Sequence, residues 1–387
     1  MLIISFDAVG NREFERLLSY PTFSQLAGQS AVFRDVSTVF VSNTYPIHSS
    51  VATGLVPGAH KLTANTETFP ARNPVWHTRE DEICARTLWQ AAAQKGIKTA
   101  AVFWPVTAYS KTIRYNVPEV LARPGKSQLL TSLKAGSTAL QLKLFLRHHS
   151  LLDGINQPSL DAFATACMVD ILREHKPGLA LIHFTAYDSL CHQHGKESPQ
   201  LTQAYEALDK NLAALLAAAA GEHDIVIFSD HDQRNVHSVV TLNDLLIEKG
   251  LLSASSNGTY MPGESGCHIE CCGGAAFFHA GTLPSSSVEE VRETVAASEG
   301  FCRFLTATEM HEAGRQATAF GFCPKIGYCY EPYPTGHKAD HGYPADAPDY
   351  TVFYMIKSPG FEPGSSTRGG SLLDIAPTVA QCLDLDW

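Results

Sequence analysis

The feature that most constrains the fold of this chain is an alternation of short apolar runs with helical patterns. Four runs rich in β-branched, leucine and aromatic residues are typical of buried strands: Leu2–Phe6, Thr99–Phe103, Leu179–Phe184 and Asp224–Phe228. Helical periodicity follows them over Glu82–Lys95, Leu160–Glu174, Gln200–Ala220 and Asp374–Leu385. The alternation predicts an α/β fold with a mostly parallel central sheet and helices on both faces.

Two segments interrupt this alternation, and we interpret both as insertions into a single domain that covers residues 1–387. The first insertion covers about residues 117–158 and has a helical pattern near Leu140–His148. The second covers about residues 250–333, where Gly, Ser and Cys clusters accompany short strands and one helix near Ser287–Ser298. We expect the second insertion to form a smaller cap.

The charge balance limits the class of partner. A formal net charge of −10 argues against a protein that coats a nucleic-acid polymer, because such surfaces are usually basic. An anionic small molecule stays possible, since bound cations would dominate the local field. The apolar start, Met1–Phe6, is too short for a secretory signal, and no run reaches 18 apolar residues. We therefore expect a cytoplasmic protein without a membrane partner; its oligomeric state is left open.

Ten cysteines are expected to be reduced thiols, because disulfides are rare in proteins that stay in the cytosol. Cys267, Cys271 and Cys272 form a cluster whose spacing matches no standard zinc pattern. A metal or redox role and ordinary packing are both open for this cluster, and packing is favoured.

Acidic and imidazole side chains follow three of the predicted strands. Asp7 follows the first strand, Asp188 the third, and the pair Asp230 and His231 the fourth. In open α/β sheets, ligands bind beyond the carboxyl ends of the strands. Asp188 and His192 are four residues apart, so a helix would place them on one face. Each residue alone has a common structural role as a cap, turn or surface pair, but together they indicate one site.

A hydroxyl and a third imidazole extend this set. Thr44 lies in the run Ser42–Leu55, and His341 lies far downstream. A hydroxyl is a poor nucleophile at neutral pH, and a bound divalent cation favours its alkoxide. Carboxylates mixed with imidazoles suit Zn²⁺ and leave coordination positions for a substrate. The set therefore predicts a two-metal site with a covalent nucleophile.

The chain resembles the alkaline phosphatase superfamily, and within it the nucleotide pyrophosphatase/phosphodiesterase group. The residues that carry the resemblance are Asp7, Thr44-Tyr45-Pro46, His48, Thr53-Gly54-Leu55, Pro57, His60, Asp188, His192, Gly195, Ser229-Asp230-His231 and His341-Gly342-Tyr343. The similarity covers most of the chain outside the insertions. It implies an alkaline-phosphatase-like catalytic domain.

The resemblance also implies two divalent metal ions, with zinc favoured. One ion would be bound by Asp188, His192 and His341. The other would be bound by Asp7, Asp230 and His231, together with the Thr44 oxygen.

Three residues receive further roles from the resemblance. Thr44 is the implied nucleophile, which would form a phosphothreonine. Asn65 is at the family position of an amide that contacts phosphate, although a turn residue is the alternative interpretation. Tyr45 matches an aromatic residue that stacks on the leaving group, with core packing as its alternative.

The chain also departs from the family pattern at several positions. His183 stands where relatives commonly carry an aromatic residue near the substrate, and Asp232-Gln233 follows His231 where glycine is frequent. These differences leave the substrate open. His337 is a rival to His341 as a ligand, but its sequence context lacks the family match.

The leading functional hypothesis is hydrolysis of phosphodiester or pyrophosphate bonds in nucleotides or related small molecules. The first alternative is a phosphonoacetate hydrolase or another phosphatase of the superfamily. A sulfatase is disfavoured, because the segment around Thr44 lacks the Arg of the sulfatase signature. An alternative of another class is a catalytically inactive protein that binds metal or nucleotide.

Overall fold

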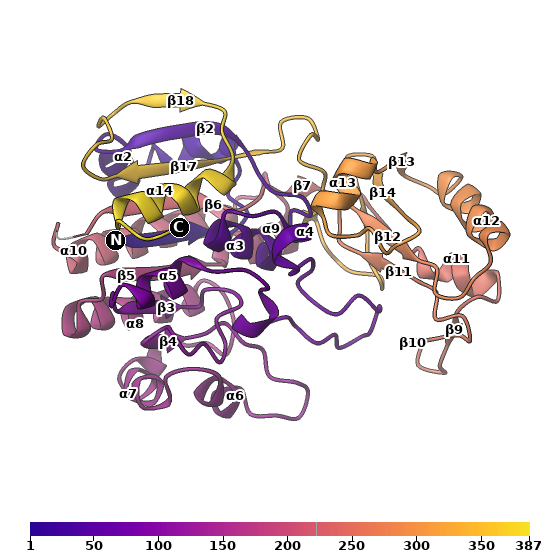
Figure 1. Cartoon of the computed structure of the whole chain (residues 1–387), viewed down its shortest axis with the longest axis horizontal. Coiled ribbons are helices and arrows are strands. Elements are labelled where there is room, and N and C mark those ends of the chain that lie inside the picture. The colour runs from indigo at the N-terminus through magenta and orange to yellow at the C-terminus, as the bar shows by residue number, and fades with distance from the viewer. Residues whose placement is uncertain (222) are drawn as a thin grey trace.

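An eight-stranded sheet forms the centre of the molecule in this computed structural model, which describes residues 1–221 and 223–387 (Figure 1). Its strand order is β18-β2-β17-β6-β1-β5-β3-β4. The strands are β1 (Leu2–Phe6), β2 (Ala31–Ser37), β3 (Thr99–Val102), β4 (Tyr115–Val117), β5 (Leu179–Phe184), β6 (Ile225–Ser229), β17 (Thr351–Lys357) and β18 (Ser366–Arg368). β17 pairs antiparallel with β2 and β6, and the other pairings described in this sheet are parallel. The predicted fold class is confirmed.

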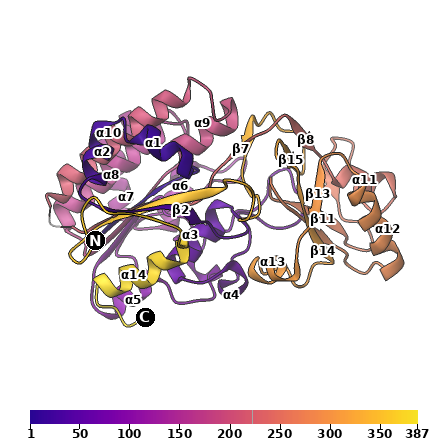
Figure 2. The same ribbon diagram turned by 90° about the horizontal axis from the view of Figure 1, so that it is seen from above.

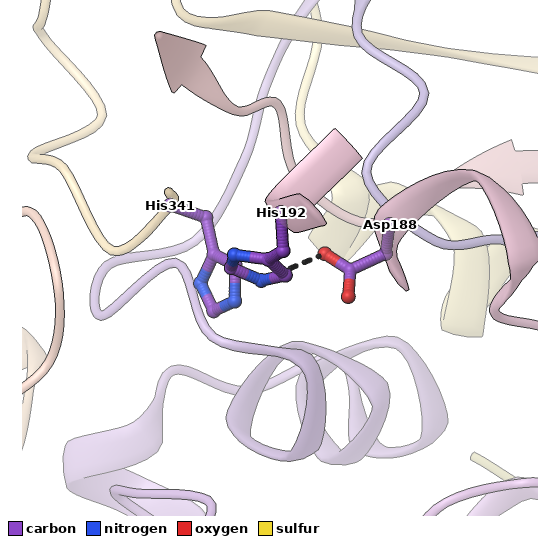
Figure 3. Close-up of side chains that lie close together, drawn as sticks. All are labelled: Asp188, His192 and His341. Carbon is purple, nitrogen blue, oxygen red and sulfur yellow. Dashed lines mark ion pairs between the residues drawn. The ribbon is translucent and has the colours of Figure 1, made fainter. Parts of the chain in front are cut away.

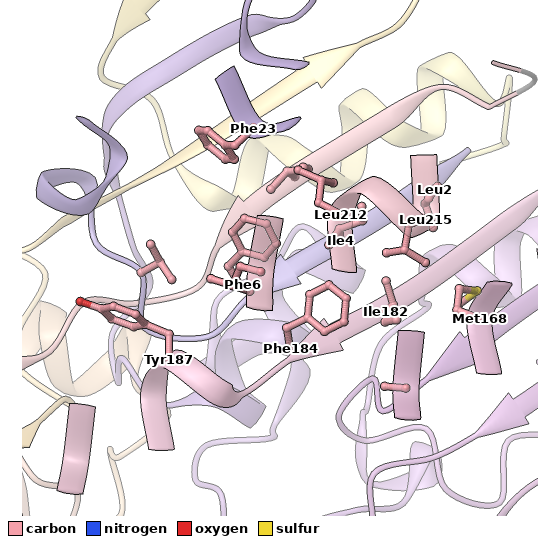
Figure 4. Close-up of a cluster of buried hydrophobic side chains, with 14 of the residues drawn as sticks. Leu2, Ile4, Phe6, Phe23, Met168, Ile182, Phe184, Tyr187, Leu212 and Leu215 are labelled. Atoms are coloured by element: carbon pink, nitrogen blue, oxygen red, sulfur yellow. The ribbon is translucent and has the colours of Figure 1, made fainter. Parts of the chain in front are cut away.

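Helices cover both faces of this sheet, as Figure 2 shows. One face carries α1 (Phe14–Leu17), α2 (Pro21–Ala27), α8 (Ser159–His175), α9 (Ala186–His194) and α10 (Leu201–Ala219). The other carries α3 (Thr44–Thr53), α4 (Pro57–His60), α5 (Leu88–Gln94) and α14 (Ile375–Cys382). Alternate residues of β1 belong to the two cores: Leu2, Ile4 and Phe6 pack on the first face (Figure 4), and Ile3 on the second. Burial of both faces explains why the strands read as continuous apolar runs.

The four predicted strands are all present, shifted by at most one residue at an end. The predicted helix Glu82–Lys95 is wrong at its start, because the helix begins only at Leu88. Thr87 caps it by accepting a hydrogen bond from the Gln90 backbone N–H, and the Gln90 side chain returns the contact. This capping box fixes the first turn, and residues 83–86 stay outside the helix.

The segment predicted as the first insertion contains α6 (Gln128–Ala135) and α7 (Thr138–His148), which lie beyond β4 at the edge of the sheet (Figure 1). The second segment contains a four-stranded sheet, in the order β11-β12-β14-β13, with an apolar core of its own. Its elements include β11 (His268–Cys271), β12 (Ala276–His279), α12 (Ser285–Ala296), β13 (Phe301–Phe304), α13 (Ala307–Glu312) and β14 (Phe320–Pro324). α11 (Asn243–Glu248) precedes the segment and contributes Leu246 to its core. The division into one domain with two insertions stays a prediction.

Short elements connect these parts. They are η1 (Asn11–Glu13), η2 (Glu80–Glu82), η3 (His149–Leu151), β7 (Arg234–Asn235), β8 (Ser238–Val240), β9 (Ser253–Ala254), β10 (Tyr260–Met261), β15 (Tyr328–Tyr330), β16 (Ala339–Asp340) and η4 (Leu372–Asp374). None of the described helices combines the length and the apolar character needed to cross a membrane.

The ten cysteines are free thiols in the structure. Cys267 is buried in the core of the second segment, and Cys271 and Cys272 stand at the end of β11. Within residues 1–221 and 223–387, no group of metal-ligating side chains includes these three. A role for the cluster stays untested.

Candidate active site

Asp7, Asp230 and His231 form the first group of converging side chains. β1 and β6 are adjacent parallel strands with Phe6 opposite Ser229, so the residues that follow them meet at one edge of the sheet. One ligand atom from each of the three side chains lies within 4.8 Å of the others, and all three side chains are buried. The structure thus brings these three residues together, and their role as metal ligands stays a prediction.

The Asp230 carboxylate is held by one of its two oxygens. Oδ1 accepts hydrogen bonds from the backbone N–H groups of Ala8 (3.0 Å) and His231 (2.8 Å). Oδ2 is buried and accepts no hydrogen bond from the described residues. His231 Nε2 lies 3.5 Å from Oδ2, and His48 Nδ1 lies 3.7 Å from it. The backbone contacts therefore fix the carboxylate and leave its second oxygen facing the group.

Asp188, His192 and His341 form the second group (Figure 3). Asp188 and His192 lie one turn apart on α9, and His192 Nε2 is 3.4 Å from Asp188 Oδ1. His341 follows β16, and its ring centroid is 5.2 Å from that of His192. Gly342 comes next with φ at +89°, and a Cβ there would collide with the carbonyl oxygen of Cys272. Glycine is therefore required where the chain turns after His341.

Thr44 lies where the two groups meet. It is the first residue of α3, and its Oγ1 is 3.4 Å from His231 Nε2. The rings of His231 and His341 have centroids 4.2 Å apart, so the first group continues directly into the second. His48, one turn along α3, contacts the Thr44 carbonyl oxygen through Nδ1 (2.8 Å). The hydroxyl predicted as the nucleophile thus contacts one of the predicted ligands, His231.

The three imidazoles of these groups share one hydrogen-bonding arrangement. Nδ1 of His192 donates to a backbone carbonyl (2.8 Å), Nδ1 of His231 lies 3.3 Å from another, and Nδ1 of His341 lies 3.1 Å from Asn43 Oδ1. Partners of this kind fix the tautomer and leave Nε2 as the nitrogen that can bind a metal. Each ring therefore has its Nε2 directed away from these partners and available to bind a metal.

Burial and close charges set the protonation of the second group. Burial alone would raise the pKa of Asp188, but the His192 ring beside it brings this pKa below its usual value. Burial alone would lower the pKa of His192, but the Asp188 carboxylate raises it to about 10. Burial, helped by the His231 ring, lowers the pKa of His341 to about 3. The pair Asp188 and His192 is thus ionised in the metal-free protein, while His341 is neutral.

The donor set fits divalent cations. In the first group, Asp7 Oδ1 and Asp230 Oδ2 are buried and accept no aligned hydrogen bond from the described residues, although His231 Nε2 lies 3.2 Å and 3.5 Å from them. Burial raises the pKa of Asp7 to about 6, because the negatively charged carboxylate is less favourable away from water. Burying two carboxylates side by side is expensive, and a bound cation would offset that cost. Carboxylate oxygens with imidazole nitrogens are ligands that suit Zn²⁺.

His337 joins a neighbouring group with His192 and Asp340. Its Nδ1 lies 3.2 Å from Asp340 Oδ2, and its side chain is 35% exposed. The structure thus places His341, and not His337, in the group with Asp188, while His192 belongs to both groups. This agrees with the preference for His341 but leaves the choice of ligand to experiment.

Asn65 and Tyr45 lie beside the first turn of α3. Asn65 Oδ1 accepts a hydrogen bond from the Tyr45 backbone N–H (2.9 Å), and its NH₂ group donates to no described residue. The Tyr45 side chain is only 3% exposed, with its ring centroid 5.4 Å from that of Trp76. Trp76 is 36% exposed, so it presents more aromatic surface to a ligand than Tyr45 does.

Sequence reasoning missed residues that hydrogen-bond to the predicted ligands. Asn43 contacts His341, and Gln233 donates a hydrogen bond to Asp188 Oδ1. Asn43 immediately precedes Thr44, and Gln233 was noted only as a departure from the family pattern. The sequence offered one indication of their role, which is that they lie beside the motif residues. Their partners are about 300 and 45 residues away in the sequence, so these contacts become visible only in the folded structure.

Proteins named as phosphodiesterases or pyrophosphatases are similar in sequence to part of this chain. Venom phosphodiesterase 2 of Crotalus adamanteus is 21% identical over 243 residues, which are 60% of this chain and 24% of that protein. Ectonucleotide pyrophosphatase/phosphodiesterase C27A7.1 of Caenorhabditis elegans is 22% identical over 265 residues, 66% of this chain and 28% of that protein. The chain spans about a quarter of the length of these curated relatives.

Two solved structures share the fold. Murine ectonucleotide pyrophosphatase/phosphodiesterase 5, in an inactive form in complex with AMP, matches with a TM-score of 0.72 at 14% identity. The human protein of the same name matches with a TM-score of 0.70 at 16% identity. Each match covers 100% of this chain and 95% of the other.

Residues 1–315 match the family model described as type I phosphodiesterase / nucleotide pyrophosphatase. The match covers most of the chain and includes both groups of converging side chains except His341. The chain therefore belongs to the type I phosphodiesterase / nucleotide pyrophosphatase family.

Proposed function

We propose that this chain hydrolyses phosphodiester or pyrophosphate bonds of nucleotides or related small molecules, with Thr44 as the nucleophile. The observation that carries the proposal is the contact of the Thr44 hydroxyl with His231, which belongs to a buried group of carboxylates and imidazole and lies beside His341 of a second such group. Family membership supports the same reaction class.

Two divalent cations, with zinc favoured, are part of this proposal. Asp188, His192 and His341 would hold one of them. Asp7, Asp230, His231 and the Thr44 oxygen would hold the other. When bound, the cations would favour the alkoxide of Thr44 and offset negative charge on the phosphoryl oxygens.

The residues of the chain then have separate tasks. Thr44 Oγ1 forms a bond to phosphorus while the bond from phosphorus to the leaving oxygen breaks, which gives a phosphothreonine. Water later breaks the new P–O bond and restores the hydroxyl. Asn65, whose Oδ1 is fixed by Tyr45, can donate its free NH₂ group to a phosphoryl oxygen. The N-terminus of α3 also favours an anion at Thr44.

Turnover of small chromogenic substrates tests this proposal. Purified protein with added Zn²⁺ should release p-nitrophenol from bis(p-nitrophenyl) phosphate, and a chelator should stop the reaction until Zn²⁺ is restored. Phosphonoacetate serves as the comparison, since the alternative hydrolase would cleave its C–P bond. Zinc binding without turnover of any of these compounds would instead favour a catalytically inactive binding protein.

A further inference from the structure

Asn65 belongs to a loop that backbone hydrogen bonds close at its base. His77 N–H donates to the carbonyl oxygen of Asn65 (2.9 Å), and Glu67 N–H donates to that of Val75 (3.0 Å). Within residues 63–77, all of which the structure describes, there is no helix and no strand longer than an isolated bridge. We call these residues the Asn65 loop. Because no helix or sheet fixes it, the loop takes its position from what it packs against.

Arg315 binds the first residue of the Asn65 loop. Its Nη2 donates a hydrogen bond to the carbonyl oxygen of Thr63 (2.9 Å), and its Nη1 donates to the Thr63 hydroxyl. Two contacts from one planar guanidinium fix the direction of the bound group as well as its distance. Thr63 is two residues before Asn65, so the contact lies close to the amide to which the proposed function gives a phosphoryl oxygen.

The backbone before Arg315 lies against the same loop residue. Gly314 has φ at +71°, and a Cβ there would come within 2.7 Å of Thr63 Cγ2 and 3.0 Å of Gly58 Cα. Glycine permits both the backbone conformation and the close approach. The arginine side chain therefore extends from a segment that is already packed beside Thr63.

A buried ion pair with the second segment holds the Arg315 guanidinium in place. Glu270 on β11 pairs with Arg315 Nη2 through Oε1, and His279 Nε2 on β12 lies 2.9 Å from Glu270 Oε2. The side chains of Arg315 and Glu270 are 6% and 4% exposed. Separating such a pair is costly, because each charge would be left buried without its partner. The four-stranded sheet thus fixes the group that binds Thr63.

Aromatic rings of the same sheet contact the middle of the Asn65 loop. The Phe69 ring lies edge-on to the His268 ring, with centroids 5.3 Å apart, and the His268 ring stacks on His279 at 4.4 Å. Burial, helped by the His279 ring, lowers the pKa of His268 to about 4, so this ring is neutral at neutral pH. It packs against Phe69 without the cost of burying a charge.

A third contact lies at the far end of the loop. Arg72 Nη2 donates to the carbonyl oxygen of Asn257 (3.2 Å), and its guanidinium carbon lies 4.7 Å from the centre of the Tyr333 ring. The Tyr333 hydroxyl donates to the carbonyl oxygen of Pro70 (2.9 Å). The second segment therefore contacts the Asn65 loop at three places, and Arg315 makes the contact nearest to Asn65 in the sequence.

We propose that Arg315 is a positioning residue for the amide of Asn65. By holding Thr63 against the second segment, it fixes the loop so that the Asn65 NH₂ group can meet a phosphoryl oxygen at Thr44. The inference rests on the proposed function, which gives Asn65 that contact. It also gives the second segment, which contains none of the predicted metal ligands, a part in supporting the active site.

Hydrogen exchange tests whether Arg315 holds the loop, and it requires no activity. Arg315→Met keeps a long side chain but removes every donor, so peptides that cover residues 61–77 should exchange roughly 10-fold faster or more, as expected for lost hydrogen bonds from a charged group. Arg303→Met is the matched control, because Arg303 lies on β13 of the same sheet and pairs with Glu309 and Asp346 instead of the loop. Unchanged exchange in Arg315→Met would overturn the inference.

A milder variant keeps the test decisive if Arg315→Met does not fold. Arg315→Lys retains a positive charge beside Glu270, but its single ammonium group cannot reproduce the planar arrangement of donors that binds Thr63. Exchange of residues 61–77 should again become faster than in the unaltered protein, and unchanged exchange would again overturn the inference.

Binding of a diester tests whether Arg315 acts through Asn65. Bis(p-nitrophenyl) phosphate is titrated calorimetrically into Zn²⁺-loaded Thr44→Ala protein, alone and with Asn65→Ala, Arg315→Met or both. Each added single change should weaken binding by roughly 5- to 10-fold. Once Asn65 is replaced, Arg315→Met should have less than about twofold further effect, because residues that act as one unit are not additive. Equal effects of Arg315→Met with and without Asn65, or no binding at all, would overturn the inference.

Turnover by the same proteins separates this inference from the proposed reaction. With Thr44 present, Arg315→Met should lower kcat/KM for the diester by roughly 10-fold at unchanged zinc content, whereas Arg303→Met should stay within about twofold, since its partly exposed ion pairs contribute little. No turnover by the unaltered protein would contradict the proposed function, and the exchange and binding results would still support or overturn the role of Arg315.

Discussion

His183 Nε2 lies 3.2 Å from Asp7 Oδ2, and both side chains are buried. The contact follows from the sheet, because β1 and β5 pair with Ser5 opposite His183, two residues before Asp7. Burial lowers the pKa of His183 to about 4, so its ring is neutral at neutral pH and carries one N–H group. Neither ring nitrogen makes an aligned hydrogen bond to a described residue. We interpret His183 as a residue that positions the Asp7 carboxylate.

Replacing His183 by phenylalanine should weaken zinc binding. Phenylalanine keeps an aromatic ring but removes the nitrogen that faces Asp7, and loss of a partner behind a metal ligand usually costs ~10–100-fold in affinity. Competition with a chromophoric chelator measures this change. His175→Phe is the matched control, because that ring stacks on Tyr115 and belongs to neither group of predicted ligands. Unchanged zinc affinity in His183→Phe would show that the contact has no positioning role.

Thr44→Ala should lower kcat by roughly 10³-fold or more and leave zinc content nearly unchanged, since the hydroxyl is one of several ligands of one ion. Rapid quenching of the unaltered protein should trap a phosphorylated peptide that contains Thr44, and mass spectrometry would identify it. Ser49→Ala is the control on the same helix, because the buried Ser49 hydroxyl has no hydrogen-bond partner among the described residues. Full activity of Thr44→Ala would exclude this nucleophile.

Loss of a predicted ligand should reduce metal content and rate together. Asp230→Asn removes the negative charge of a carboxylate whose Oδ1 accepts hydrogen bonds from two backbone N–H groups. His341→Ala removes a predicted ligand of the second group. His337→Ala should have the smaller effect, because its more exposed ring pairs with Asp340. Zinc content by mass spectrometry and diester turnover are measured on the same samples. A larger loss in His337→Ala than in His341→Ala would reverse the assignment.

Zinc affinity should rise with pH. Burial would lower the pKa of His231 and His192, but the neighbouring carboxylates raise these values to about 9 and about 10 in the metal-free protein. Below these values each ring carries a proton that zinc must displace, so binding should release protons and tighten between about pH 6 and about pH 9. Calorimetric titration at pH 7 in two buffers of different ionisation enthalpy counts the protons. Zinc uptake without proton release would contradict the charged state of these rings.

The same pKa shifts affect the stability of the metal-free protein in the opposite direction. Both histidines have a raised pKa in the fold, so their ion pairs stabilise it below the ordinary value of 6.5 and lose this contribution as pH rises through about 9. The melting temperature without metal should therefore fall over that range, while zinc affinity rises.

Sequence reasoning placed site residues together where a local pattern or the end of a strand determines their position. Asp7 and Asp230 could be placed together, because each follows an apolar run that becomes a parallel strand, and His192 follows Asp188 by one helical turn. β17 was not predicted, although it pairs antiparallel with β6 at the centre of the sheet. Its pairing depends on contacts between residues more than 100 positions apart, which no local pattern contains.

The surroundings of the site were beyond sequence reasoning for the same reason. His183 was recognised only as a departure from relatives, and its contact with Asp7 depends on strand pairing. The cavity of about 710 Å³ requires α6, α7 and α8 to be arranged around one space. The apolar residues of α6 and α7 alone would suit an ordinary core equally well.

Cationic side chains that could meet a second phosphate charge are already engaged elsewhere. Lys196 Nζ lies 3.0 Å from Glu13 Oε1, and Arg234 Nη1 donates to Asp232 at 2.8 Å. Lys61, the cation nearest in sequence to α3, donates to a backbone carbonyl of α4. A phosphate monoester carries one more negative charge than a diester at neutral pH, and none of these three described side chains is free to meet it.

We therefore expect a higher kcat/KM for a diester than for the monoester with the same leaving group, by roughly 10-fold or more. The monoester lacks the attraction that a cation ~4 Å from its second charge would supply, which is about 1 kcal/mol even in water and larger in a partly buried site. The comparison of bis(p-nitrophenyl) phosphate with p-nitrophenyl phosphate at pH 8 measures this ratio. Asn65→Lys, which places a cation beside the first turn of α3, should shift the ratio toward the monoester, whereas Lys61→Met should leave it unchanged because that side chain is turned to α4. A monoester preference in the unaltered protein would instead favour a phosphatase of the same superfamily.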